Sequence, residues 1–148
     1  MTIRKRIQED LKKSMKAKDG ERVSVLRLVI AAIKNREIEL KDDLDDDQIL
    51  EVVVSSAKRS KESSDAFRDG GREDLAQKEE RELKILEEYL PEQLTPEKIR
   101  EIVSEAVRAT GSSSPADMGK VMKEVMPRVR GRADGKVVNS IVKELLSG

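Results

Sequence analysis

Cysteine and histidine are both absent from the 148 residues of the sequence. Their absence excludes a disulfide framework, a cysteine or histidine zinc site, and any nucleophile that depends on an imidazole base. The aromatic residues are one tyrosine and one phenylalanine, so a broad platform for stacking the bases of single-stranded RNA is excluded as well. We expect no metal ion and no cofactor, and composition alone does not identify a function.

Long apolar segments are also lacking. The longest uninterrupted run is Leu28–Ile33, far short of the roughly 20 residues that span a bilayer. No apolar core of a signal peptide follows the basic segment 1–18, and Glu9 and Asp10 within it argue against a mitochondrial presequence. The sequence therefore predicts a cytoplasmic protein with no membrane partner.

Charged residues make up 41% of the chain and hydrophobic residues 36%, which is typical of solvated helices around a narrow aliphatic core. Apolar residues recur at helical spacing almost throughout, without the alternation of a strand. The sequence predicts an all-α protein, and the second helix, apolar on most of its sides, is expected to be central. The predicted helices begin at Thr2, Glu21, the acidic segment 42–47, Arg72, Pro96, Ser114–Pro115 and Asp134, and the third and sixth end at Gly70–Gly71 and Pro127.

The segment Leu90–Pro96 is the best candidate for a domain boundary, because its two prolines interrupt the helical pattern. We expect an N-terminal helical hairpin or bundle over residues 1–92 and a small three-helix domain over residues 95–148. Residues 1–94 carry 20 basic and 23 acidic side chains, whereas residues 95–148 carry 10 and 7. A net charge of zero therefore conceals a basic C-terminal part.

Several motifs carry a resemblance to a known family. They are DMGKVMK at 117–123, MP at 126–127, GRADGKVVN at 131–139, GREDL at 71–75 and YLPEQL at 89–94. With these motifs the chain resembles the YqeY family of small bacterial proteins over essentially its whole length.

The C-terminal part is also similar to the tail domain of GatB, a subunit of the glutamine-dependent tRNA amidotransferase (a carbon–nitrogen ligase). It departs from that pattern by extra residues around 126–129 and by Asp134–Gly135 in place of Asn-Pro. In the amidotransferase the tail is implied to contact tRNA, while the chemistry lies in a separate subunit and a separate domain. The resemblance therefore implies a non-catalytic accessory module. Its partners would be tRNA or another structured RNA, bound weakly and salt-sensitively, and a protein of the tRNA aminoacylation or amidation machinery.

Cations are concentrated between residues 118 and 143. A helix N-terminus with free N–H donors near Lys136 could hold a phosphate, and Gly131 and Gly135 allow close approach of a backbone. The alternative is solvated loop charge, with Gly131 as a turn residue and Asp134 as a helix cap. The predicted RNA-binding residues are Lys120, Lys123, Arg128, Arg130, Arg132, Lys136 and Lys143.

Other patterns favour structural interpretations. The serines Ser112–Ser114 invite comparison with the Ser-Ser-Lys arrangement of amidases, but the glycine-rich surroundings are missing, so we expect a helix cap and no catalytic residue. The acidic segment 42–47 lacks the spacing of an EF-hand, and a loop with a cap is favoured over a cation site. A methionine stripe at helical spacing is expected to be core. The rival function is a protein-interaction module in which the basicity of the C-terminal part is incidental.

Overall fold

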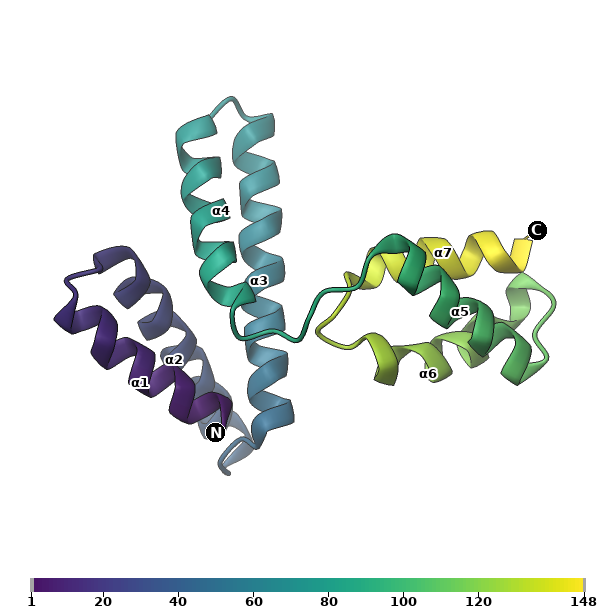
Figure 1. Cartoon of the computed structure of the whole chain (residues 1–148), viewed down its shortest axis with the longest axis horizontal. Coiled ribbons are helices and arrows are strands. Elements are labelled where there is room, and N and C mark those ends of the chain that lie inside the picture. Colours follow the sequence, from purple (N-terminus) through teal and green to yellow (C-terminus); the bar gives the residue numbers. More distant parts are fainter. Residues whose placement is uncertain (1, 148) are drawn as a thin grey trace. The chain divides into compact units, whose positions relative to one another are not determined.

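The computed structural model describes residues 2–147 (Figure 1), and its two compact units are Met1–Leu90 and Pro91–Gly148. The described residues form helices only, so the predicted all-α fold is confirmed. None of these helices is both long and apolar enough to cross a bilayer. The N-terminal unit contains α1 (Ile3–Lys16), α2 (Gly20–Leu40), α3 (Asp46–Asp69) and α4 (Glu73–Glu87); the C-terminal unit contains α5 (Pro96–Thr110), the 3-10 helix η1 (Pro115–Asp117), α6 (Met118–Val129) and α7 (Gly135–Ser147).

Short polar side chains define where most helices begin. The side chains of Thr2, Asp19 and Thr95 each accept a hydrogen bond from a backbone N–H in the first turn of α1, α2 and α5. At the start of α3, Asp45 and Gln48 form a reciprocal capping box. The helix boundaries are therefore encoded locally, at residues that the sequence marks as caps.

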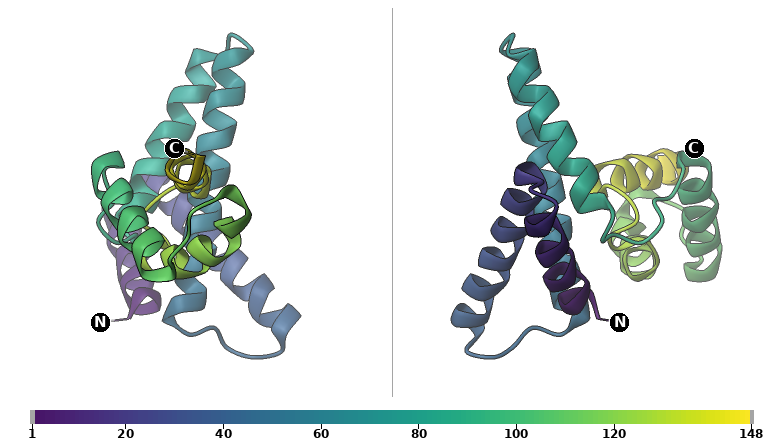
Figure 2. Two further views of the ribbon diagram at one scale, coloured as in Figure 1. Left: turned by 90° about the vertical axis from the view of Figure 1, so that its right-hand side faces the viewer. Right: turned by 60° about the vertical axis from the view of Figure 1, so that its left-hand side comes forward.

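The N-terminal unit consists of two helical hairpins, α1–α2 and α3–α4, and the α3–α4 hairpin projects beyond the other (Figures 1 and 2). The turn between α3 and α4 includes Gly71, whose φ of 76° is a conformation that glycine adopts without strain. The core is aliphatic and includes Ile7, Leu26, Ile49 and Val53, all at most 1% exposed. Burial of these side chains against one another holds the two hairpins together.

Helix α2 packs against α1, α3 and α4, in agreement with its expected central position. Its inner face is buried at Leu26 and Val29, but Leu28 and Ile38 are 67% and 73% exposed. The apolar pattern on most sides of α2 therefore does not reflect full burial.

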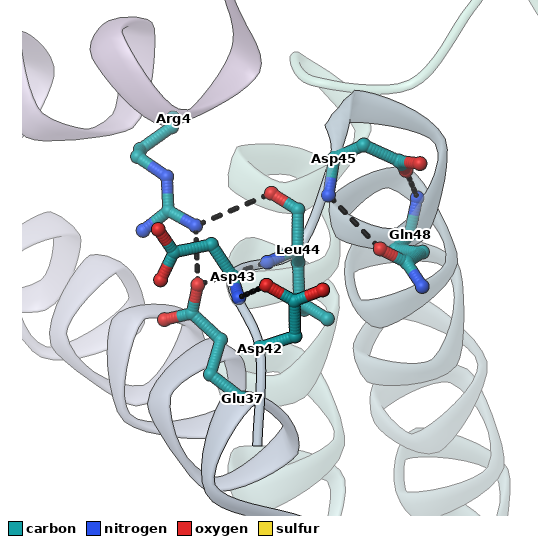
Figure 3. Close-up of polar contacts among 7 residues, drawn as sticks. All are labelled: Arg4, Glu37, Asp42, Asp43, Leu44, Asp45 and Gln48. Carbon is teal, nitrogen blue, oxygen red and sulfur yellow. Dashed lines mark hydrogen bonds and ion pairs between the residues drawn. The ribbon is translucent and has the colours of Figure 1, made fainter. Parts of the chain in front are cut away.

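Polar contacts fasten the acidic segment between α2 and α3 (Figure 3). Glu37 accepts a hydrogen bond from the Leu44 N–H at 3.0 Å and pairs with Arg4 at 2.7 Å. The Leu44 N–H, and next the Arg4 guanidinium, hold the pKa of Glu37 below its usual value. Asp42 accepts from the Asp43 N–H at 2.9 Å. The segment is a loop leading into a capped helix, and no group of three metal-ligating side chains comes together within residues 2–147.

Tyr89 anchors the end of the N-terminal unit. Its ring is 3% exposed, its hydroxyl donates to Asp10 at 2.5 Å, and the Arg6 guanidinium lies 5.1 Å from the ring centroid. Burial, and next the hydrogen bond to Asp10, raise the pKa of Tyr89 well above its usual value. Because Tyr89 is the only tyrosine and the chain has no tryptophan, its fluorescence reports on this unit alone.

The C-terminal unit packs α5, α6 and α7 around a valine-rich core that includes Val103, Val121 and Val142, each 0% exposed. The prediction that Pro127 ends the sixth helix is wrong, because α6 continues to Val129 with the proline inside it. A proline in the last turn forgoes only one intrahelical hydrogen bond, and the continued helix buries Val129 at 1% exposure. The same helix also begins later than predicted, since residues 115–117 form a separate 3-10 turn.

Candidate nucleic-acid interface

A tight corner joins α6 to α7 in the middle of the basic segment. The Arg130 N–H donates to the Met126 carbonyl at 3.0 Å and the Arg132 N–H donates to the Val129 carbonyl at 2.8 Å. Between the two arginines, Gly131 is buried and has a φ of 74°. The corner therefore has a defined backbone conformation that depends on a glycine.

Residues from the start of the C-terminal unit hold this corner in place. The Leu94 N–H donates to the Arg132 carbonyl at 2.8 Å, and the Gln93 side chain donates to the Gly131 carbonyl at 2.8 Å. Leu94 also packs against the core of the unit. The sequence analysis missed this brace, since its only signal was the presence of Gln93 and Leu94 in the YLPEQL motif, and spacing does not reveal bonds between segments 38 residues apart.

The positive φ of Gly131 predicts that replacing this glycine destabilises the C-terminal unit. We expect Gly131→Ala to lower the free energy of unfolding of the C-terminal unit by about 1–2 kcal/mol, because an alanine at positive φ is strained. The matched control is Gly119→Ala in α6, where an added Cβ meets no atom within 4 Å and the higher helix propensity of alanine stabilises by up to about 1 kcal/mol. Chemical denaturation followed by far-UV circular dichroism measures both changes, and equal effects of the two substitutions would contradict this account of the corner.

The structure places the seven predicted cations at different positions of the C-terminal unit. Four are exposed on the helices: Lys120 and Lys123 on α6, and Lys136 and Lys143 on α7. Two belong to the corner itself: Arg130 is exposed, and Arg132 is partly buried with its Nε donating to the Glu92 carbonyl at 3.2 Å. The seventh, Arg128, pairs with Glu105 of α5 at 2.9 Å.

Ion pairs show which flanks of α6 and α7 face α5. Arg128 marks the α5 flank of α6, and Glu144, paired with Arg100 at 2.8 Å, marks the α5 flank of α7. The pair with Glu105 therefore directs Arg128 toward α5, whereas Lys123 and Lys143 are exposed on their helices.

The N-terminus of α7 carries its own cap. The Asp134 carboxylate accepts a hydrogen bond from the Lys136 N–H at 2.9 Å, and the Asp134 carbonyl accepts from the Val138 N–H at 3.1 Å. The cap that was expected at Asp134 is present. Because this carboxylate occupies the first turn of α7, the side chains of the corner are better placed than the helix end to meet an anion.

Ser112, Ser113 and Ser114 belong to the turn between α5 and α6. The N–H groups of Ser113 and Ser114 donate to the Asp117 carboxylate at 3.0 and 3.4 Å, and the Ser112 hydroxyl lies 2.6 Å from that of Thr110. The Ser113 N–H is the largest of the influences that lower the pKa of Asp117. These bonds assign the serines to a capped turn.

The methionine stripe of α6 lies against the core of the C-terminal unit, as expected. Met118, Met122 and Met126 are partly buried and pack against the core of the C-terminal unit. A flexible side chain of this kind fills irregular space between helices. The stripe is therefore part of the folded unit.

Comparisons with known proteins connect this fold to a family. The family model described as Yqey-like protein matches residues 4–146. A Kluyveromyces lactis protein is 44% identical over 84 residues, which cover 56% of this chain and 45% of that protein. A Pyrenophora tritici-repentis protein is 31% identical over 144 residues, which cover 95% of this chain and 79% of that protein. A Saccharomyces cerevisiae protein is 28% identical over 148 residues, which cover 93% of this chain and 80% of that protein. Thus the match spans less than half of the Kluyveromyces lactis protein.

All three relatives are named "Altered inheritance of mitochondria protein 41, mitochondrial". These names correct the expectation of a cytoplasmic protein, which rested on the composition of residues 1–18. In the structure Ile3–Lys16 is helix α1, with Ile7 buried in the core, so this segment is part of the folded N-terminal unit. The chain belongs to the Yqey-like protein family.

Proposed function

We propose that this chain is a non-catalytic accessory module that binds tRNA, or a complex containing tRNA, through the C-terminal unit. The surface that would carry this activity is called the C-terminal basic surface and comprises Lys120, Lys123, Arg128, Arg130, Arg132, Lys136 and Lys143. The observation that carries the proposal is the braced corner. Arg130 and Arg132 flank the buried Gly131, and the corner is held by hydrogen bonds from the Gln93 side chain to the Gly131 carbonyl and from the Leu94 N–H to the Arg132 carbonyl.

A fixed corner supports phosphate binding because its cations need little ordering on contact with RNA. Arg132 is oriented by the Glu92 carbonyl at 3.2 Å, and Lys136 follows in the first turn of α7. Arg128 is paired with Glu105, but both side chains are 49% exposed, and an exposed pair of this kind is worth little in free energy. Exchange of Glu105 for a phosphate would therefore cost little.

The surface fits recognition of the RNA backbone better than recognition of bases. The C-terminal unit contains no aromatic residue, so it has no aromatic side chain on which unpaired bases could stack. Arginine and lysine side chains that contact phosphates fix the position of an RNA without reading its sequence. The similarity of this unit to the tRNA-contacting tail of the amidotransferase favours tRNA as the structured RNA.

Binding of this kind is expected to depend strongly on salt. If four of the cations contact phosphates, the logarithm of the association constant should fall with the logarithm of the salt concentration with a slope of about −3 to −4, since each contact contributes about −0.7 to −0.9. Filter binding or fluorescence anisotropy with unfractionated tRNA at several salt concentrations measures this slope. Absence of binding at low salt, or a slope near zero, would contradict the proposal.

A protein-interaction module is the second candidate function, and a different observation favours it. Leu28 and Ile38 of α2 are 67% and 73% exposed, so this helix presents two large apolar side chains to solvent. Both side chains belong to the N-terminal unit, whereas the proposed RNA contacts belong to the C-terminal unit. The two functions therefore do not exclude each other.

A further inference from the structure

A hollow of about 230 Å³ lies between three helices of the N-terminal unit, α2, α3 and α4. Each helix contributes side chains spaced three or four residues apart, which share one face of a helix. Those of α3 are Ser56, Arg59, Ser60 and Ser63. Since a water molecule takes up about 30 Å³ of the liquid, the hollow has room for a molecule of roughly eight to ten non-hydrogen atoms. We call this feature the α2–α3–α4 hollow.

Ser60 is a buried polar residue that lines the hollow. It is 8% exposed, and no hydrogen bond joins its hydroxyl to another residue within the described range 2–147. Its oxygen is not closed off from the surface. On the same helix the buried Ser64 hydroxyl, by contrast, donates to Glu80 at 3.4 Å. Because a buried hydroxyl without a partner costs free energy, Ser60 indicates that the hollow holds a polar molecule.

Two carboxyl groups line the hollow from α4. Glu79 and Glu82 are partly buried and lie three residues apart, on one face of the helix. Burial, and next the negative charge of Glu79, raise the pKa of Glu82, and Lys78 opposes this shift without cancelling it. A positively charged group in the hollow would remove the repulsion between the two carboxylates.

A guanidinium group lines the same hollow from α3. Arg59 is exposed, and no ion pair joins it to a carboxylate in the part of the chain that the structure describes. Arg68 of the same helix, by contrast, pairs with Glu73 at 2.9 Å and with Glu80 at 2.6 Å. A guanidinium binds a carboxylate through two parallel hydrogen bonds, so Arg59 offers a site for a carboxylate of another molecule.

The remaining wall of the hollow is apolar. Val25 and Val29 of α2 and Leu86 of α4 line it, and each is 3% exposed. Apolar walls with a few convergent polar groups are typical of small-molecule sites. The hollow therefore combines an apolar surface, an unpaired cation and two neighbouring carboxylates.

We propose that the α2–α3–α4 hollow binds a free α-amino acid with an apolar side chain, of about the size of leucine. Arg59 pairs with the carboxylate of the ligand, and Glu79 and Glu82 accept hydrogen bonds from its ammonium group. The apolar side chain of the ligand covers Val29 and Leu86. The mixed charge of the hollow favours this occupant, because a zwitterion presents both charges in one small molecule. The proposal concerns the N-terminal unit and does not depend on RNA binding by the other unit.

An NMR titration of the ¹⁵N-labelled full chain tests the proposal with three ligands that share one carbon skeleton. Leucine carries both charges, 3-methylbutylamine lacks the carboxylate, and 4-methylpentanoate lacks the ammonium group. We expect leucine to shift the amide signals of residues lining the hollow, with a Kd of about 1 mM or tighter. Each of the other two ligands is expected to bind at least about tenfold more weakly, because it loses a charged hydrogen-bonding group.

Two substitutions on α4 provide a matched comparison. Glu82→Gln keeps the shape of the side chain and is expected to weaken leucine binding about tenfold. It should not lower the free energy of unfolding, since it removes a partly buried charge that Glu79 repels. Glu87→Gln makes the same change at an exposed position of α4 outside the hollow and should bind leucine like the wild type.

A substitution on α3 tests the contact with the carboxylate separately. Arg59→Gln is expected to weaken leucine binding about tenfold and to leave the binding of 3-methylbutylamine unchanged. Absence of leucine-induced shifts at about 10 mM, equal affinity for the three ligands, or equal losses for Glu82→Gln and Glu87→Gln would overturn the proposal.

Discussion

Replacement of Ile33 by alanine is expected to lower the free energy of unfolding of the N-terminal unit by about 2–5 kcal/mol. Ile33 is 3% exposed and belongs to the core that joins the two hairpins. Its truncation removes apolar contacts and leaves a cavity that the neighbouring side chains cannot fully occupy. Such a loss is a large part of the stability of a small helical unit.

The same substitution at Ile38 provides the matched control. Ile38 lies on the same helix but is 73% exposed. We expect Ile38→Ala to change the free energy of unfolding by no more than about 0.5 kcal/mol, with a small gain from the higher helix propensity of alanine.

Urea titration followed by the fluorescence of Tyr89 measures both variants. A local reporter is needed because a chain with two units need not unfold in a single transition, and Tyr89 is buried in the N-terminal unit. Similar losses for Ile33→Ala and Ile38→Ala would show that the assigned inner and outer faces of α2 are wrong.

The sequence predicted the helical elements because their signals are local. Helices were expected to begin at Thr2 and Asp134, and each of these side chains accepts a backbone hydrogen bond at the start of one. The predicted stop at Pro127 failed because proline is a strong but not absolute helix breaker. Burial of Val129, a contact with the rest of the unit, outweighs the local preference.

The candidate site shows a different limit. The sequence identified the cations of residues 118–143 but did not show which of them are exposed and which are paired with other side chains. The bond between Arg128 and Glu105 joins residues 23 apart, and that between Gln93 and Gly131 joins residues 38 apart. Hydrogen-bond partners at such separations follow from the packing of helices, which periodicity alone does not specify.

Helix α2 shows how much periodicity establishes for an apolar helix. Its apolar residues occupy most of its sides, which predicts a central helix, and their spacing predicts that Leu26, Val29 and Ile33 face inward. The structure buries these three side chains and leaves Leu28 67% exposed. The extent to which the other sides are covered depends on the number of neighbouring helices, which is a property of the whole fold.

The central claim concerns the corner of the C-terminal unit, and a triple substitution is expected to have the largest effect on it. Replacing Arg130, Arg132 and Lys136 together by alanine should weaken tRNA binding about 100-fold at low salt, because each lost contact is worth about 1 kcal/mol. The slope of binding against salt should also become shallower by about 2 to 3.

Two controls separate this effect from changes of net charge and of folding. Replacing Lys12, Lys13 and Lys16 of α1 by alanine removes the same number of positive charges from exposed positions of the other unit. Its effect should stay below about threefold, since these lysines are not part of the C-terminal basic surface and salt screens exposed charges that make no contact with a phosphate. The double variant Arg130→Lys with Arg132→Lys retains the charge of the corner and should keep most of the affinity if phosphates are the ligands.

The most direct measurement is therefore the affinity for tRNA of the wild type and the two triple variants, determined side by side at low salt after circular dichroism has established equal helix content. The account predicts similar, measurable binding at low salt by the wild type and by the α1 variant, and a loss of about two orders of magnitude for the corner variant. Equal affinity of all three proteins, or a larger loss for the α1 variant, would contradict it.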